Sequence, residues 1–399
     1  MKTPENSGLK RLRWSQVLFV RATRFGACLL LMLLWGCSST LPTPEAAIDP
    51  NWLLSGEVLF AEPVAPEMLP DDDILGLEPE IRRYLAQIAP DESPQQRLVA
   101  LVHAFENRDF TVQYQADRTL TASETYTRQQ GNCMAFTVMM VAMARELGAE
   151  AHFNQVEVPP VWGHEEAQTF VVYRHINMVS ETSRGRRVVD FNLAAYDPVY
   201  DQQKISDAEA FGQYYSNRGI EWMQQGDMRQ AFLYLRKALA LRPESADLWA
   251  NLGAFYSRNQ QPEAAEQSYL QALQLQEDHN IAISNIERLY RKQQRFALAD
   301  QYAEKARFHR QRNPYYLYYQ ARNAYEHGDY KNAKRQLKRA LWRHENDHRF
   351  HFLLGLTNFK LGEIEDSLEH FSAAFSLANN PGTQQAYNRK LEYLRNQQQ

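Results

Sequence analysis

Residues 246–279, ADLWANLGAFYSRNQQPEAAEQSYLQALQLQEDH, hold the pattern that decides most of the fold. Small and apolar side chains recur there at helical spacing in two runs, with a polar turn between them. The same pattern returns in both directions at a fixed step, equal to the length of this stretch. Two columns of small residues read Ala231, Ala265, Ala299, Ala333, Ser367 and Ala238, Ala272, Ala306, Ala340, Ala374, and a turn column reads Gly226, Gln260, Gln294, Gly328, Gly362. A fixed period without insertions predicts an all-α array of helical hairpins.

The second unit carries Trp249-x2-Leu252-Gly253-x2-Tyr256 and then Ala265-x3-Tyr269. This arrangement resembles the tetratricopeptide repeat signature. The resemblance implies five units, at 212–245, 246–279, 280–313, 314–347 and 348–381, with a capping helix over 382–399. Small residues in the two columns let paired helices approach closely, and the turn column closes each hairpin. The resemblance also implies a protein or peptide partner in the groove of the array.

The segment before the repeats has mixed helical and strand periodicity. Gly131-Asn132-Cys133 opens a run without Gly or Pro that stops at Gly148. Asn132 is expected to cap the start of a helix and Gly148 to close its end, which places Cys133 in the first turn. Because this helix is apolar on nearly every side, we expect it to be central and buried.

Cys133 is the candidate nucleophile. A thiol at a helix N-terminus meets the positive end of the helix dipole, which stabilises a thiolate. Strand-like runs at 169–179 and 186–191 are joined by a polar hairpin, and a turn centred between residues 182 and 183 places His175 opposite Asp190. A Cys nucleophile, a His base and an orienting Asp form a catalytic triad. The alternative is an ordinary buried cysteine.

At these residues the chain resembles the transglutaminase-like superfamily over about residues 95–195. The resemblance rests on Gly131-x-Cys133 at the helix start, the Ala144–Gly148 helix end, and His175 and Asp190 in the strands that follow. It implies a papain-like α+β domain over 80–205 and acyl-enzyme chemistry on an amide. Ile176-Asn177 after His175 and Phe191-Asn192 after Asp190 depart from the commonest family pattern, which affects substrate and acceptor preference. Two residues are candidates for lining the acyl site, Tyr114 and Asn132, with a core role as the alternative for the tyrosine.

The N-terminus predicts export. A basic segment precedes the apolar run 27–35, which is shorter than the roughly 20 residues that span a bilayer. The run ends in Leu34-Trp35-Gly36-Cys37, which resembles a lipoprotein signal peptide over 1–36. The resemblance implies lipid on Cys37 as the membrane anchor, and Ser38 favours the outer membrane, facing the periplasm. An uncleaved short anchor is the alternative. Residues 37–79 are acidic and Pro-rich, which predicts a tether with one short strand at Glu57–Ala61.

Composition excludes several function classes. The chain has 44 Lys and Arg against 48 Asp and Glu, and residues 1–36 hold six of the former and one of the latter. The remainder therefore carries 38 basic and 47 acidic groups, a net charge of −9, which argues against nonspecific nucleic-acid binding. No phosphate loop, dinucleotide motif or metal-ligand spacing predicts a cofactor or metal, although His152, His164, Glu165 and Glu166 lie within one stretch.

Two functions remain open at this point. The first is an envelope enzyme in which Cys133 attacks a peptide, isopeptide or glutamine amide, and water or an amine resolves the thioester. The second is a non-catalytic scaffold with a degenerate papain-like binding domain. The Cys133, His175 and Asp190 set favours the enzyme. The oligomeric state is not predicted.

Overall fold

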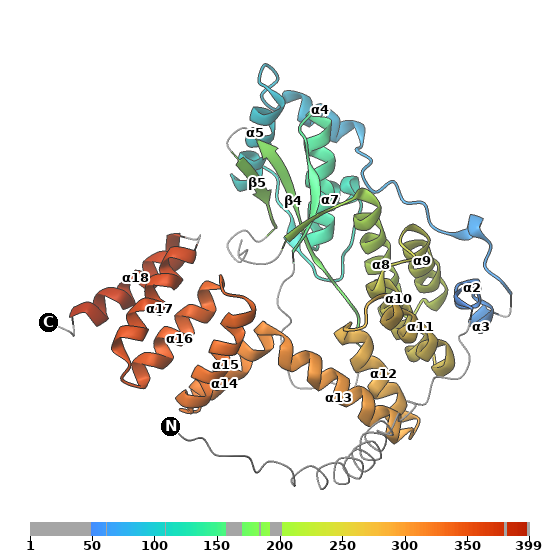
Figure 1. Cartoon of the computed structure of the whole chain (residues 1–399). Coiled ribbons are helices and arrows are strands. Elements are labelled where there is room, and N and C mark those ends of the chain that lie inside the picture. The colour runs from blue at the N-terminus through green and yellow to red at the C-terminus, as the bar shows by residue number, and fades with distance from the viewer. Residues whose placement is uncertain are drawn as a thin grey trace, which may run out of the picture. The chain divides into compact units, whose positions relative to one another are not determined.

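The computed structural model describes residues 49–60, 62–107, 109–156, 170–182, 185–191, 202–378 and 381–396. Helices dominate, with a small sheet in the N-terminal half (Figure 1). The fold class is the expected one, an α+β domain followed by an all-α array of helical hairpins. None of the helices in the described ranges is long and apolar enough to cross a membrane. The predicted signal peptide and Cys37 lie outside these ranges.

The α+β domain is built around one buried helix. Its helices are α4 (Pro79–Gln87), α5 (Pro94–Glu106), α6 (Ala122–Arg128) and α7 (Cys133–Glu146). A capping box starts α5, because Ser93 Oγ accepts the amide of Gln96 while the Gln96 side chain accepts the amide of Ser93. Every residue of α7 from Met134 to Ala144 is buried. This helix contacts α4, α6 and the main sheet, as its apolar sequence predicts.

The main sheet is antiparallel throughout, in the order β5-β4-β3-β6. Its strands are β3 (His152–Val156), β4 (His175–Thr182), β5 (Gly185–Val189) and β6 (Gln202–Ile205), and a parallel pair, β1 (Gln113–Tyr114) and β2 (Gln130–Gly131), precedes α7. The predicted strand at 169–179 was wrong at its beginning, since β4 starts at His175. The amides of Phe170 and Val172 bond to side chains of the repeats instead of a neighbouring strand.

The repeats are consecutive helix pairs. The pairs are α8 (Asp207–Gln225) with α9 (Met228–Leu241), α10 (Ala246–Arg258) with α11 (Pro262–Leu275), α12 (Asn280–Lys292) with α13 (Phe296–Arg312), α14 (Pro314–Glu326) with α15 (Tyr330–Arg343), and α16 (His348–Lys360) with α17 (Ile364–Leu377), followed by α18 (Pro381–Asn396). Helix α8 begins before residue 212 because Ser206 caps it, accepting the amide of Glu209.

The columns seen in the sequence have distinct physical causes. All ten small residues of the two columns are at most 5% exposed, so they lie where helices pack closely. All five residues of the turn column have positive φ: Gly226 87°, Gln260 58°, Gln294 61°, Gly328 79° and Gly362 80°. This left-handed conformation favours glycine, which has no Cβ. The column is therefore defined by its backbone conformation, which two glutamines also adopt.

The predicted tether is folded in its described part. Residues 57–60 form a short helix, α3 (Glu57–Phe60), rather than the expected strand. After α2 (Pro50–Ser55), Gly56 turns the chain with a φ of 85°, and its carbonyl accepts the amides of Leu59 and Phe60. These local hydrogen bonds satisfy the backbone without a partner strand. A 3₁₀ turn follows at Pro66–Met68.

This N-terminal segment docks on the first repeats. Leu53 and Val64 are buried, and the hydroxyl of Tyr256 donates a hydrogen bond to the carbonyl of Leu53. Further along, the amide of Asp72 donates to Tyr215 Oη over 2.9 Å, and Tyr214 Oη donates to the Asp72 carboxylate over 3.1 Å. Burial of scattered apolar residues against the array therefore overrides the linker-like composition.

One apolar core runs from Leu53 to Ala306, so it joins the docked segment, the α+β domain and the first three helix pairs. From Leu317 onwards the last two pairs and α18 form separate, smaller clusters. Helix α13, at this boundary, leaves Phe296 and Phe308 more than half exposed. Residues 48–399 belong to one compact unit, but its apolar packing is interrupted after α13.

Candidate active site

The start of α7 presents Cys133 as the sequence predicts. Asn132 caps the helix, its Oδ1 accepting the amide of Ala135 over 3.0 Å. At the other end Gly148 has a φ of 78°, and the amides of Gly148 and Ala149 close the last turn on carbonyls inside the helix. Cys133 is the first helical residue and is half-buried. Its thiol therefore lies at the positive end of the α7 dipole.

Gly131 is required by a close approach. A Cβ built on Gly131 would lie 2.6 Å from the Cβ of Ala135, nearer than such atoms come in proteins. The chain thus passes tightly against the first turn of α7 before Asn132 caps it. This contact is a steric reason for the Gly-x-Cys spacing, independent of any catalytic role.

His175 and Asp190 meet, although the predicted strand register was wrong. Met178 pairs with Val189 and Thr182 with Gly185, so partners sum to 367 rather than 365. His175 itself pairs with Val156 on β3. The register differs by two residues, and because side chains alternate with a period of two, the same faces stay together. His175 Nε2 lies 2.7 Å from Asp190 Oδ2 as a diagonal neighbour.

The electrostatics of the site favour a charged imidazole. Burial alone would lower the pKa of His175, but hydrogen bonds to Asp190 and Cys133 and the charges of both groups outweigh it. Together they raise the pKa of His175 from 6.5 to about 10. The Asp190 carboxylate that bonds the ring is only 5% exposed. This is the arrangement in which a carboxylate orients an imidazole beside a thiol.

A buried chain of amides behind Asp190 was not foreseen from the sequence. Asn177 Nδ2 donates to Asp190 Oδ2 over 2.9 Å, and Asn154 Nδ2 donates to Asn177 Oδ1 over 2.8 Å. Arg186 in turn donates to Asn154 Oδ1. Both asparagines are fully buried. The available signal was a polar residue inside each apolar strand, which usually means a satisfied buried hydrogen bond.

The other two predicted site residues lie in different surroundings. Tyr114 is 55% exposed, its ring centroid 5.4 Å from that of Phe191, and burial and then the charge of Cys133 raise its pKa. Tyr114 pairs with Gly131, two residues before Cys133, so its exposed ring lies near the start of α7. Asn132 is buried, and besides capping α7 its Nδ2 donates to Thr119 Oγ1 over 2.7 Å. The structure gives Asn132 a structural role, and its part in lining an acyl site stays a prediction.

Of the remaining candidates, the structure describes His152, which makes an ordinary surface contact. His152 Nε2 lies 2.7 Å from a carboxylate oxygen of Glu150, its neighbour on the surface. His164, Glu165 and Glu166 fall outside the described residues. Within the described ranges, no three His, Cys, Asp or Glu side chains are grouped so that they could hold a metal ion.

Comparison with protein families finds matches in the α+β domain and in the repeats. Residues 82–172 match the family model described as Transglutaminase-like superfamily, and residues 223–286 and 318–382 match two described as Tetratricopeptide repeat. The chain joins a transglutaminase-like domain to tetratricopeptide repeats. The transglutaminase-like match includes Cys133 and ends at residue 172, before His175 and Asp190. No curated protein matches the chain.

Solved structures that resemble the chain do so weakly. A structure from a functional characterisation of Pseudomonas aeruginosa pilF is 19% identical, with 47% of this chain and 94% of that one covered and a TM-score of 0.25. MamA from Desulfovibrio magneticus RS-1 is 16% identical over 43% and 96% of the two chains, with a TM-score of 0.24. The Cut9-Hcn1 complex is 14% identical over 47% and 37%, with a TM-score of 0.26. TM-scores this low carry no argument about function.

Proposed function

We propose that this protein is a cell-envelope cysteine hydrolase or acyltransferase that acts on a peptide, isopeptide or glutamine amide. The observation that carries the proposal is the His175 ring, whose Nε2 lies 2.7 Å from Asp190 Oδ2 and whose pKa is raised by both Asp190 and Cys133. A buried carboxylate beside an imidazole and a thiol at a helix N-terminus are the three parts of a thiol acyl-transfer site.

The proposed reaction has two balanced steps. The Cys133 thiolate attacks the amide carbonyl, the C–N bond breaks, and the His175 imidazolium gives its proton to the departing amine. In this scheme the amides at the start of α7 that are not bonded to Asn132 would stabilise the developing oxyanion. Water or a second amine then attacks the thioester, His175 takes its proton, and the acid or the new amide leaves with Cys133 restored as thiolate.

The substrate side of the site is open and aromatic. Tyr114 and Phe191 contact each other, and Phe191 also packs on Phe136 of α7 with ring centroids 5.2 Å apart. An exposed ring beside a thiol suits the flat face of a peptide or the aliphatic stem of glutamine. The repeats would bind a protein partner and so raise the local concentration of substrate at Cys133.

We further propose that the chain is a lipoprotein anchored through Cys37, on the residues Leu34-Trp35-Gly36-Cys37 alone. Replacing Cys37 by Ser should block processing and lipid attachment, and membrane fractionation with mass spectrometry of the N-terminus checks this. A variant that matures and fractionates normally would exclude the anchor while leaving the proposed chemistry untouched.

The chemistry is tested by alkylation of the full-length protein with iodoacetamide, read as modification of the peptide that carries Cys133. A thiolate beside an imidazolium and a helix dipole reacts at pH 6, where an ordinary thiol is nearly silent. His175→Ala should remove most of this reactivity. If Cys133 in the folded wild type reacts only above pH 8, or only after denaturation, it is an ordinary core cysteine. The enzyme proposal then fails, and the protein is a scaffold. Capture of an acyl adduct on Cys133 in envelope extract, absent in Cys133→Ala, identifies the substrate.

A further inference from the structure

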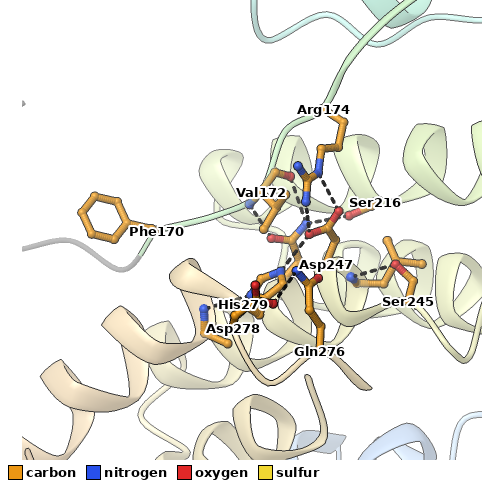
Figure 2. A network of polar contacts seen from close by, with 12 residues as sticks. Phe170, Val172, Arg174, Ser216, Ser245, Asp247, Gln276, Asp278 and His279 are labelled. Carbon is orange, nitrogen blue, oxygen red and sulfur yellow. Dashed lines mark hydrogen bonds and ion pairs between the residues drawn. The ribbon is translucent and has the colours of Figure 1, made fainter. Parts of the chain in front are cut away.

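Residues 170–174, here called the strap, cross the array before the chain enters β4 at His175. Figure 2 shows Val172 and Arg174 of the strap directed at side chains of the repeats. The strap's hydrogen-bond partners lie in α10 and α12. The strap belongs to no helix or strand. The proposed reaction makes no use of the strap, although the strap leads directly into His175, the proposed base.

Two asparagines at the same repeat position hold the strap backbone. Asn251 Oδ1 accepts the amide of Val172 over 2.7 Å, and its Nδ2 donates to the carbonyl of the same residue over 3.1 Å. Asn285, one repeat later, makes the same pair of bonds to Phe170, at 3.0 and 2.8 Å. Phe170 and Val172 are two residues apart in the strap, and the asparagines that bind them are one repeat apart. Alternate residues of the strap therefore bind successive repeats. Both asparagines are buried, where such bonds are costly to lose.

Side chains fix the strap as well. Val172 is 7% exposed, and the guanidinium of Arg288 lies 4.2 Å from the ring centroid of Phe170. Arg174 bonds Asp247 through Nε and Nη2, at 2.8 and 2.9 Å.

A second partner holds the same carboxylate in place. His279 Nε2 lies 2.8 Å from Asp247 Oδ1, opposite Arg174 in Figure 2. Burial opposes ionisation of Asp247, but the bonds to His279 and Arg174 prevail and hold its pKa well below the usual range. A bidentate, partly buried ion pair therefore fixes the residue next to His175.

The sheet alone holds His175 weakly. The pair of Val156 with His175 is the last in the β3–β4 ladder. On the other side the β4–β5 ladder reaches no further than Met178 with Val189. His175 thus lies at a strand end with a ladder on one side among the described residues, where fraying is easiest. The strap contacts begin at the adjacent residue, Arg174.

We propose that Asn251 and Asn285 are positioning residues for the acyl-transfer reaction. By clamping the strap they hold the backbone of His175 so that its ring stays between Cys133 and Asp190. The solenoid is then part of the catalytic apparatus, and the groove of its second and third hairpins is occupied by the protein's own chain. This inference rests on the proposed function, since it needs a Cys133–His175 pair.

The experiment compares the iodoacetamide reactivity of Cys133 at pH 6 and pH 9.5 in full-length protein. The test variant is Asn251→Ala with Asn285→Ala. The matched control is Asn217→Ala, which stands one repeat before Asn251 at the same repeat position. An ordinary thiol is roughly 0.3% ionised at pH 6, so a misplaced His175 should lower the rate at pH 6 by about tenfold or more while the rate at pH 9.5 changes by no more than about twofold. The control should keep the wild-type ratio of the two rates.

A second variant keeps the test decisive if the double asparagine variant fails to fold. Val172→Pro removes the amide that Asn251 accepts while leaving the repeats unchanged, and near-ultraviolet circular dichroism reports folding of each variant. Folded variants that lose the pH 6 rate, with no further loss when Val172→Pro is added to Asn251→Ala, support the clamp. Folded variants with the wild-type rate ratio overturn it and leave the proposed function standing. A wild type that is silent at pH 6 overturns the proposed function itself.

Discussion

Replacing Asp190 by Asn tests the electrostatics of the candidate site most directly. The change keeps the side-chain size but removes the charge 2.7 Å from His175 Nε2. In the wild type, burial lowers the pKa of His175, while bonds and charges from Asp190 and Cys133 raise it from 6.5 to about 10. That difference corresponds to a preference for the charged ring on the order of 5 kcal/mol. Without the carboxylate, only the Cys133 contributions oppose burial, so the pKa of His175 should fall well below its wild-type value.

The sign of the stability effect follows from this pKa. The folded protein binds the His175 proton more tightly than the unfolded chain does, so the stabilisation is fully present below about pH 6.5. It is lost as the pH rises through about 10. The proposed Cys133 thiolate binds one proton fewer than the unfolded thiol does below about pH 8.5, which offsets this loss up to that pH. The wild type should therefore lose unfolding free energy mainly between about pH 8.5 and 10, and Asp190→Asn should lose much less there.

Urea unfolding at pH 6, 8 and 10 measures this slope. Asp207→Asn is the control, because the hydrogen bond from Arg145 lowers the pKa of Asp207. Stabilisation from a lowered carboxyl pKa is present above the unfolded value of 3.8 and lost only as the pH falls. The control should therefore keep the wild-type slope between pH 6.5 and 10. Equal slopes in wild type and Asp190→Asn would refute the reasoning.

Three further predictions concern stability. Gln260→Gly should raise the unfolding free energy by about 1 kcal/mol, because Gln260 holds a φ of 58°, and Gly226→Ala should lower it by a similar amount in the same urea titration. Ala265→Leu should cost roughly 1–3 kcal/mol because the site is fully buried, and a thermal melt indistinguishable from wild type would contradict close packing there. A fragment of residues 38–205 should lack a cooperative transition while one of 38–313 keeps it, because the core is continuous across them; limited proteolysis and urea unfolding decide.

The parts of the fold predicted from sequence are those set by local or periodic constraints. The small columns and the turn column recur at the same place in every repeat, because each hairpin has the same close helix contacts and the same left-handed turn residue. Both ends of α7 were predictable, because Asn132 caps its start and Gly148 closes its last turn. His175 and Asp190 were paired despite a register error of two residues, since that error preserves the strand face.

The parts that sequence reasoning missed depend on partners far along the chain. Asn251 and Asn285 stand one repeat apart, a visible signal, but their partners lie 79 and 115 residues earlier. Residues 49–79 have the composition of a linker, and only the presence of the array turns Leu53 into a buried residue. Asn177 was read as part of a departure from the family pattern, whereas it bonds Asp190 directly.

The docking of the N-terminal segment on the repeats also shortens the free chain between Cys37 and the folded part of the protein. A free chain over 37–79 could extend by about 150 Å, at roughly 3.5 Å per residue. Docking begins at Asp49, whose side chain caps α2, so the stretch from Cys37 to that point extends by about 40 Å at most. If the chain is anchored through Cys37, the free stretch before Asp49 ends at the first repeats and not at the α+β domain. In such an anchored chain, the point where the folded part begins could lie no further from the membrane surface than this stretch allows.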